Sequence, residues 1–263
     1  GGRTREDLWK LLMINTRTPE ALDGDLRAMI GSTRIGAERV VALVEELGLD
    51  HFHDYFEGIL AHADRRFREC IGAIPDGDYD AEEAIDHDCF EPTDAKIRVE
   101  LRVQGDAMTV DFTGTDGQVR GFKNSSVANT WSAVYMALAS YFDPDLPRNE
   151  GTFRNVEIIA PEGSIVNARP PAAMTMNTVF IAHEIVHAIW KALGQALPER
   201  SCAGWGKSIH GTTSGWTDAE SRFVMYHWIS VPGGGAVDGR DGFNQIGHLI
   251  ALGGLVLPNV ETY

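Results

Sequence analysis

Residues 97–112 read IRVELRVQGDAMTVDF, and this stretch decides the fold class. Apolar side chains alternate with polar or charged ones in its first half, 97–103, and again in 108–112. A period of two residues is typical of a strand with one buried and one solvated face. Gly105 and Asp106 separate the two runs and favour a tight turn. The stretch therefore predicts a β-hairpin.

Helical periodicity lies on both sides of this hairpin. Apolar residues recur every three or four positions in 25–47, 50–74, 125–142 and 177–197, and we expect a helix over each range. The first two helices are expected to form an N-terminal helical hairpin. A short apolar run over 156–160 predicts a further strand. The fold class is therefore α+β, with antiparallel β-hairpins and long helices packed on a mixed sheet.

Glycine becomes frequent beyond Ser201 and is interleaved with aromatic residues. Because glycine weakens regular elements and permits positive φ, we expect tight turns and close backbone approaches in this C-terminal region. The whole chain is expected to contain a helical segment over 1–75 and an α+β core over 76–263. We expect the two to form one continuous domain that is incomplete at both ends.

Composition excludes several function classes. The chain has 263 residues, of which 43% are hydrophobic, so it can bury a substantial core. Its net charge of −15 repels nucleic acid and anionic lipid, and no apolar run approaches the roughly 18 residues of a membrane span. The three cysteines contain no C-x-x-C pair. We therefore expect a cytoplasmic protein that binds neither nucleic acid nor membrane.

The sharpest short motif is H-E-x-x-H, formed by His183, Glu184 and His187 in a helical run. In zinc peptidases this spacing places two imidazoles on one helix face, and the glutamate activates the bound water. The metzincin continuation fails, because Trp190 and Leu193 stand where glycine and histidine would follow. A buried helix with hydrogen-bonded histidines explains the motif better, and a zinc site at His183 and His187 is the alternative.

Other candidate groups have simple structural interpretations. The polar clusters in 51–54 and 86–88 could chelate a cation, but solvated loop or helix-start residues explain them more simply. Cys202 lacks the local context of known cysteine proteases. No P-loop occurs. The glycine-rich stretch 233–242 could form a backbone cradle for an anion, with Arg240 supplying charge, or a tight turn without a ligand.

Several short motifs follow one another in a specific order along nearly the whole chain. They include Arg17-Thr18-Pro19, Ile74-Pro75-Asp76-Gly77-Asp78, Val110-Asp111-Phe112-Thr113-Gly114-Thr115, Asp143-Pro144-Asp145-Leu146-Pro147, Ala160-Pro161-Glu162-Gly163-Ser164, Asn167-Ala168-Arg169-Pro170-Pro171, Ala196-Leu197-Pro198-Glu199-Arg200 and Gly239-Arg240-Asp241-Gly242. In this order the chain resembles the hydantoinase B family. That family includes the C-terminal half of 5-oxoprolinase and the large subunits of acetone and acetophenone carboxylases.

The resemblance implies an enzyme subunit that works in a hetero-oligomer. A hydantoinase A-type partner uses ATP and Mg²⁺ to phosphorylate an amide or enol oxygen of the substrate. The B-type partner then hydrolyses the activated cyclic amide, such as a hydantoin, oxoproline or lactam. Carboxylation of an activated ketone is the second possibility, and a non-catalytic assembly role is the third. The resemblance also implies that this chain is an internal portion of a longer subunit, and that a divalent metal such as Zn²⁺ or Mn²⁺ is held upstream of it.

Within the family motifs, polar side chains beside special backbone positions are expected to form the pocket. The expected catalytic residues are Asp111, Asn124 and Asn177. Each also has a structural interpretation, Asp111 as a turn former and the two asparagines as helix N-caps. The expected ligand-binding residues are Gly233, Gly234, Gly235, Arg240 and Asp241.

Overall fold

The computed structural model describes residues 2–143, 145–175, 177–206, 209–217, 223–230 and 233–243. The chain forms two compact units. The first comprises Gly1–Gly58 and His210–Trp228, and the second comprises Ile59–Ile209 and Ile229–Tyr263. The division into segments 1–75 and 76–263 stays a prediction.

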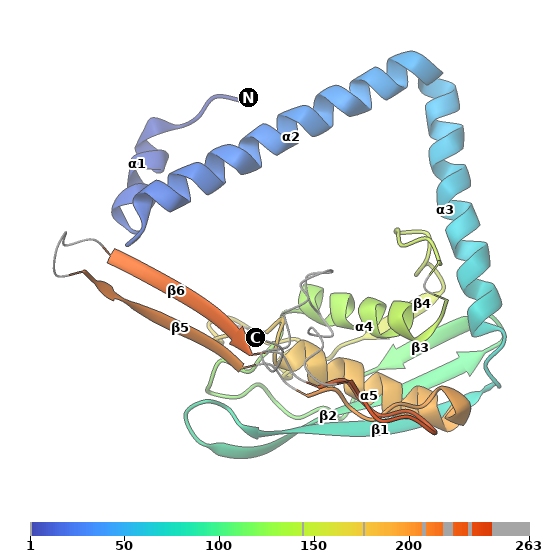
Figure 1. Cartoon of the computed structure of the whole chain (residues 1–263). Coiled ribbons are helices and arrows are strands. Elements are labelled where there is room, and N and C mark those ends of the chain that lie inside the picture. Colours follow the sequence, from blue (N-terminus) through green and yellow to red (C-terminus); the bar gives the residue numbers. More distant parts are fainter. Residues whose placement is uncertain are drawn as a thin grey trace. The chain divides into compact units, whose positions relative to one another are not determined.

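Helices and strands follow one another as labelled in Figure 1. The helices are α1 (Glu6–Ile14), α2 (Pro19–Leu47), α3 (Leu49–Ile71), α4 (Val127–Tyr141), α5 (Ile181–Ala196) and the short 3₁₀ helix η1 (Pro198–Arg200). The strands are β1 (Gly77–His87), β2 (Pro92–Gln104), β3 (Ala107–Asp111), β4 (Val156–Ile159), β5 (Ile209–Trp216) and β6 (Phe223–Ser230). The mixture of helices and strands confirms the predicted α+β class. Among the described helices, none is both long and apolar enough to cross a lipid bilayer.

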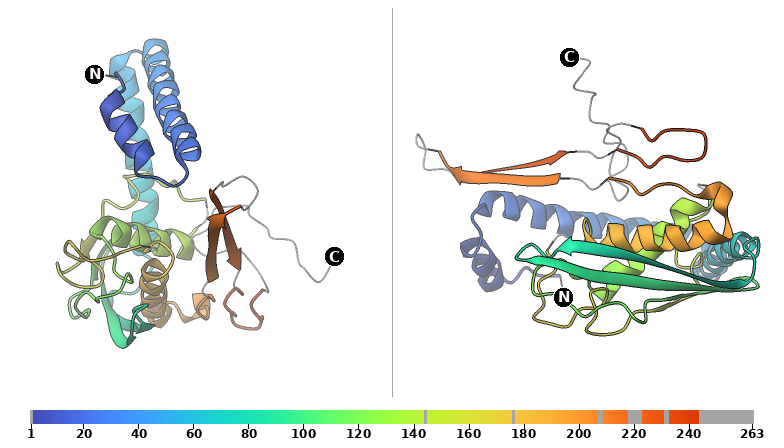
Figure 2. Two further views of the ribbon diagram at one scale, coloured as in Figure 1. Left: turned by 90° about the vertical axis from the view of Figure 1, so that its left-hand side faces the viewer. Right: turned by 90° about the horizontal axis from the view of Figure 1, so that it is seen from below.

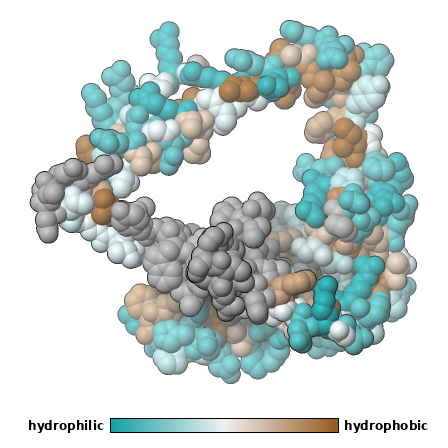
Figure 3. Space-filling model, viewed as in Figure 1, coloured by the Kyte–Doolittle hydropathy of each residue, from teal (hydrophilic) through white to brown (hydrophobic). Residues whose placement is uncertain are grey.

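The first unit contains a helical hairpin made by α1 and α2. Trp9 Nε1 donates to Asp23 Oδ1 at 2.8 Å, and the Arg27 guanidinium pairs with Asp23 at 2.7 Å while lying over the Trp9 ring. This hairpin differs from the predicted one, which joins the helices expected over 25–47 and 50–74, and the sequence pattern does not predict α1. No side chain of α2 is buried. Figure 3 shows apolar surface along this helix, where Val41 is 56% exposed.

Two further features of this unit follow from glycine. Gly48 has φ +78° and separates α2 from α3, as a helix-terminating glycine does. Strands β5 and β6 pair in a two-stranded sheet despite Gly211 and Gly215, so the expected weakening of regular structure does not hold there. Residues 244–263 of the glycine-rich region lie outside the described residues.

The second unit is built on a sheet in the order β1-β2-β3-β4. Strands β1, β2 and β3 pair antiparallel, and β3 and β4 pair parallel. Strands β2 and β3 confirm the predicted hairpin, with Gln104 opposite Ala107 and Gly105 at φ +61° in the turn. Strand β4 confirms the prediction over 156–160. Strand β1 was not predicted, because its solvated face is strongly acidic and Ile85 is its only buried side chain.

Helix α5 lies along one face of this sheet against β1 and β2, and α4 packs against α5 (Figures 1 and 2). The alternating residues Ile97, Val99, Leu101 and Val103 are at most 3% exposed. Burial of each such side chain contributes about 1.5–3 kcal/mol. The end of α3 adds its own apolar stripe, including the fully buried Phe67, as its periodicity predicts. This core fixes the strand and helix ends that carry the candidate site.

Candidate active site

Asp111 stands at the carboxyl end of β3, opposite Ile159 at the end of the parallel strand β4. Its Oδ1 atom accepts a hydrogen bond from Thr113 N at 2.8 Å. This is an Asx turn, which bends the chain out of the strand. The carboxylate is half-exposed, so it also faces solvent at the sheet edge. The turn-forming interpretation is confirmed, and a catalytic role for Asp111 stays a prediction.

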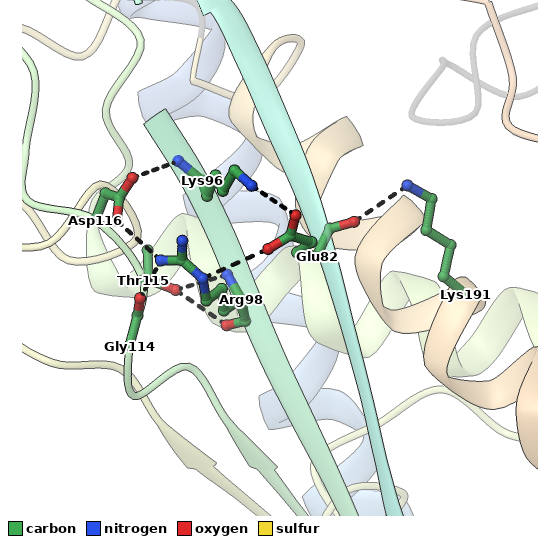
Figure 4. A network of polar contacts seen from close by, with 7 residues as sticks. All are labelled: Glu82, Lys96, Arg98, Gly114, Thr115, Asp116 and Lys191. Atoms are coloured by element: carbon green, nitrogen blue, oxygen red, sulfur yellow. Dashed lines mark hydrogen bonds and ion pairs between the residues drawn. The ribbon is translucent and has the colours of Figure 1, made fainter. Parts of the chain in front are cut away.

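A polar network fixes the loop that follows Asp111 (Figure 4). Asp116 accepts from Lys96 N at 2.9 Å and from Arg98 Nη1 at 2.9 Å. Thr115 Oγ1 exchanges two hydrogen bonds with the backbone of Arg98, both of 3.0 Å. The backbone N–H of Lys96, followed by the Arg98 guanidinium, lowers the pKa of the Asp116 carboxyl. The loop is therefore held in register with β2.

The same network reaches β1 and α5 through Glu82. Lys96 Nζ donates to Glu82 Oε1 at 2.8 Å and lowers the pKa of that carboxyl, and Lys191 Nζ donates to Glu82 O at 3.1 Å (Figure 4). These groups are partly exposed, and surface ion pairs contribute only about 0–1 kcal/mol each. The network therefore contributes more to loop geometry than to stability.

Asn124 is completely buried and lies at the centre of the loop that precedes α4. Its Oδ1 accepts from Val119 N at 2.8 Å. Its Nδ2 donates to Val119 O, Gly121 O and Ala173 O at 2.9 to 3.0 Å. The side chain thus joins two loops that are distant in sequence. It is not the N-cap of α4, because Ser126 occupies that position and accepts from Asn129 N. The N-cap interpretation of Asn124 is wrong.

Asn177 lies just before α5 and is half-buried. Its carbonyl oxygen accepts from Ala182 N at 3.0 Å and from Asn129 Nδ2 at 3.2 Å. Helix α5 begins at Ile181 instead of the predicted residue 177, and its N-cap position is Phe180, without a side-chain cap. The N-cap interpretation of Asn177 is therefore also wrong. Asn177 is thus bonded to Asn129 of α4, and Asn124 is bonded to Ala173 in the segment that precedes Asn177. Among the described residues, no hydrogen bond joins Asp111 to either asparagine.

Asp88 also supports the loop that precedes α4, through Gly121, and the sequence analysis did not predict this role. It is 2% exposed, so the expectation of a solvated cluster over 86–88 is wrong for this residue. Its carboxylate accepts from the N–H groups of Phe90, Glu91 and Gly121, each at 2.8 Å. These bonds, led by that of Glu91, lower the pKa of Asp88. A side chain at Gly121 would overlap Asp88 O, at 1.7 Å, so only glycine fits.

The predicted ligand-binding loop folds onto a second segment, residues 202–206. Ala203 N donates to Ala236 O at 2.8 Å, and Gly206 N donates to Gly233 O at 3.1 Å. Any side chain at Gly235 would meet Ala203 O at 1.8 Å, so close approach requires glycine at this position. Gly234 contributes to closing the loop by donating its N–H to Phe243 O at 2.8 Å.

Arg240 and Asp241 lie at the exposed end of this loop. Arg240 and Val237 exchange backbone hydrogen bonds of 3.0 and 3.1 Å across a turn that contains Gly239 at φ +72°. The Arg240 guanidinium lies 5.0 Å from the centre of the Phe243 ring. Within the described residues, no hydrogen bond or ion pair joins Arg240 or Asp241 to Asn124 or Asn177. The described hydrogen bonds and ion pairs therefore do not connect the glycine-rich loop to Asn124 and Asn177.

The H-E-x-x-H residues are buried in α5, with His183, Glu184 and His187 at 1%, 0% and 8% exposure. His187 Nε2 accepts from Trp205 N at 3.2 Å, which agrees with the interpretation of a hydrogen-bonded histidine. Among the described residues, no group of three or more histidine, cysteine, aspartate or glutamate side chains could hold a metal ion. The zinc-peptidase interpretation thus finds no third metal ligand beside His183 and His187 among the described residues.

A cleft of about 910 Å³ lies elsewhere, at the carboxyl ends of α4 and α5. Two family motifs line it, through Asp143 and through Leu197 to Arg200, together with Arg66 and Cys70. Burial raises the pKa of the Cys70 thiol, and Arg66 is already paired with Asp143 at 3.3 Å. None of the predicted site residues lines this cleft, so we do not take it as the active site.

Comparison with known proteins assigns the family. The family model described as hydantoinase B/oxoprolinase matches residues 1–263. The chain belongs to the hydantoinase B/oxoprolinase family. A protein of Pseudomonas sp. (strain NS671), assigned as the B-type component of a D-/L-hydantoinase, is 30% identical over 93% of this chain and 43% of its own length. The beta component of caprolactamase from Pseudomonas jessenii is 28% identical over 99% of this chain and 45% of its own length. The chain thus spans less than half of these family members.

Solved structures show the same family fold. The crystal structure of ATP-dependent caprolactamase from Pseudomonas jessenii matches with a TM-score of 0.85, covering 100% of this chain and 46% of that chain at 28% identity. A nucleotide-free acetone carboxylase structure matches with a TM-score of 0.78 over 94% of this chain and 35% of that chain. Its identity is 16%, so this likeness concerns the fold alone.

Proposed function

We propose that this chain is part of the B-type subunit of an ATP-dependent cyclic amide hydrolase. The observation that carries the proposal is the match to ATP-dependent caprolactamase along the whole chain, at 28% identity. The hydantoinase relative supports the same reaction class, because hydantoins and lactams are both cyclic amides. Ketone carboxylation is the alternative, and its support is the fold of acetone carboxylase.

The substrate in this proposal is a ring amide that has been phosphorylated on oxygen. Such a species carries negative charge, which the amino ends of helices favour. Helices α4 and α5 present their amino ends beside Asn177, and α5 has no side-chain cap. Asn177 is half-exposed there and supplies a polar contact. Asn124 holds the loop before α4 against Ala173, and the half-exposed Asp111 at the end of β3 supplies an acceptor.

The glycine-rich loop is the proposed second contact with the ligand. Its backbone packs closely against Ala203, and Arg240 and Asp241 add one positive and one negative group at its exposed end. Hydrolysis of an O-phosphorylated lactam consumes two water molecules, breaks the ring C–N bond and releases inorganic phosphate. The single ring-opened product carries one amine and one carboxylate, which a pair of opposite charges suits. The described residues of this chain supply orientation and charge in this scheme.

ATP and Mg²⁺ are assigned mainly to a hydantoinase A-type partner. The names of the relatives support this division, because the hydantoinase relative is a B-type component and the caprolactamase relative a beta component. A divalent metal such as Zn²⁺ or Mn²⁺ is assigned to a portion of the enzyme outside this chain. No set of described residues fits such an ion, so we derive no step through it. A cytoplasmic location is part of the proposal, since Cys70, Cys89 and Cys202 are all free thiols.

Reconstitution tests the proposal. The complete subunit that contains this chain is combined with its A-type partner, and ATP hydrolysis is measured against a panel of hydantoins, oxoproline and lactams. We expect one of these compounds to stimulate ATP turnover and to yield its ring-opened acid, an N-carbamoyl amino acid from a hydantoin or an amino acid from oxoproline or a lactam. Stimulation by a ketone with bicarbonate, together with a new carboxylate product, would instead support the carboxylase alternative.

A further inference from the structure

The H-E-x-x-H helix and the glycine-rich loop are connected by one buried imidazole. His187 is 8% exposed on α5, and its Nε2 accepts a hydrogen bond from Trp205 N at 3.2 Å. A Cβ added at Gly204 would lie 3.5 Å from the imidazole Cε1, so the Gly204 backbone passes close to the ring. Segment 202–206 therefore rests on the His187 ring.

This segment is also the support of the predicted ligand-binding loop. Ala203 N donates to Ala236 O at 2.8 Å, Gly206 N donates to Gly233 O at 3.1 Å, and Cys202 forms a backbone bridge with Val237. The glycine at position 235 allows this contact, because a Cβ there would lie 1.8 Å from Ala203 O. A short series of contacts thus runs from α5 through 202–206 to 233–237.

We propose that His187 is a positioning residue: its Nε2 lone pair fixes segment 202–206 and, through it, the glycine-rich loop that carries Arg240 and Asp241. A backbone N–H that donates to Nε2 requires a lone pair on that nitrogen. The histidine of the motif therefore acts as a hydrogen-bond acceptor here, which is a different task from metal binding. The inference rests on the proposed function only in so far as this loop binds the substrate.

Two substitutions at His187 distinguish the effect of the hydrogen-bond acceptor from the effect of filling the space. His187→Gln places an amide oxygen near the position of Nε2 and keeps an acceptor, whereas His187→Leu fills the space without one. Hydrogen exchange of the backbone amides in 202–206 and 233–243, measured on the complete subunit, reports on the support directly. We expect exchange to be about tenfold faster in the leucine variant and near the wild-type rate in the glutamine variant.

Kinetics of the reconstituted complex link this support to the ligand. In the leucine variant we expect KM for the cyclic amide to rise about tenfold while kcat changes less than about twofold, and the glutamine variant should restore KM. Unchanged amide exchange in His187→Leu would overturn the support role. Faster exchange with unchanged KM would contradict the ligand-binding role of the loop, and so the link to function. Loss of a bound metal in both variants would show that His187 is a ligand and overturn the proposal.

A variant on the loop side covers the case in which His187→Leu fails to fold. Gly235→Ala leaves α5 intact and forces the loop away from Ala203 O. It should accelerate exchange in 202–206 and raise KM, as the leucine variant does. Wild-type exchange in 202–206 for Gly235→Ala would contradict the proposed contact between the two segments.

Discussion

Replacing Asn124 with alanine should destabilise the protein strongly, because this side chain joins two loops from a fully buried position. Its oxygen satisfies Val119 N, and its two N–H groups are shared among the carbonyls of Val119, Gly121 and Ala173. Alanine removes these contacts and leaves the backbone groups without this partner. The oxygen and the two N–H groups together make the equivalent of three hydrogen bonds. At about 1 kcal/mol for each, the free energy of unfolding should fall by about 3 kcal/mol. The melting temperature should then fall by roughly 6–12 °C.

Urea unfolding of the complete subunit measures this loss, and Asn15→Ala is the matched control. Asn15 is exposed and makes one hydrogen bond, to Leu11 O, so its replacement should change the free energy of unfolding by less than about 0.5 kcal/mol. Equal stability of the two variants would refute the reasoning. A stable but inactive Asn124→Ala enzyme would instead favour the role first predicted from the family motifs, direct contact with the ligand.

Three further predictions concern the core and the titrating groups. Ile185→Ala in the buried face of α5 should cost about 2–5 kcal/mol in urea unfolding, whereas Ile35→Ala, at a 56% exposed position, should cost less than about 0.5 kcal/mol. The folded state lowers the pKa of Asp116. The contribution of this carboxylate to the free energy of unfolding is therefore complete above the unfolded-state pKa of about 3.9, and it is lost as the pH falls through the folded-state pKa. The stability deficit of Asp116→Asn should therefore shrink in acid, and a deficit independent of pH would contradict this. Burial raises the pKa of Tyr141 to about 12, so the phenolate absorbance that Tyr141→Phe removes should appear only near pH 12; loss of absorbance near pH 10 in this variant would show that Tyr141 is not buried.

Local patterns were sufficient to predict the elements with a clear period. The β2–β3 hairpin follows from alternation and a glycine turn, and the stripe of α3 follows from its spacing. Strand β1 alternates in exposure, but Glu83 interrupts the apolar side chains on its inner face, so the sequence pattern is weak. Its place is set by pairing with β2 and by the packing of α5. Its conformation depends on contacts that are distant in sequence.

The same distinction applies to the candidate site. The family motifs indicated candidate segments, and the structure links the two asparagines to different partners, Asn124 to Ala173 and Asn177 to Asn129. The clamp made by Asn124 depends on a carbonyl 49 residues away, and the acceptor role of His187 depends on an amide 18 residues away. No periodicity encodes such pairs. A single sequence therefore indicated which residues were candidates, but not what their atoms contact.

The most direct test of the central claim is product analysis in the reconstituted enzyme. The complete subunit, its A-type partner, ATP and a cyclic amide are combined, and ADP and ring-opened amino acid are quantified together. We predict that amino acid forms only with ATP present and in proportion to ADP. Ring opening that proceeds without ATP, or ATP turnover that responds only to a ketone with bicarbonate, would contradict the assignment as a cyclic amide hydrolase.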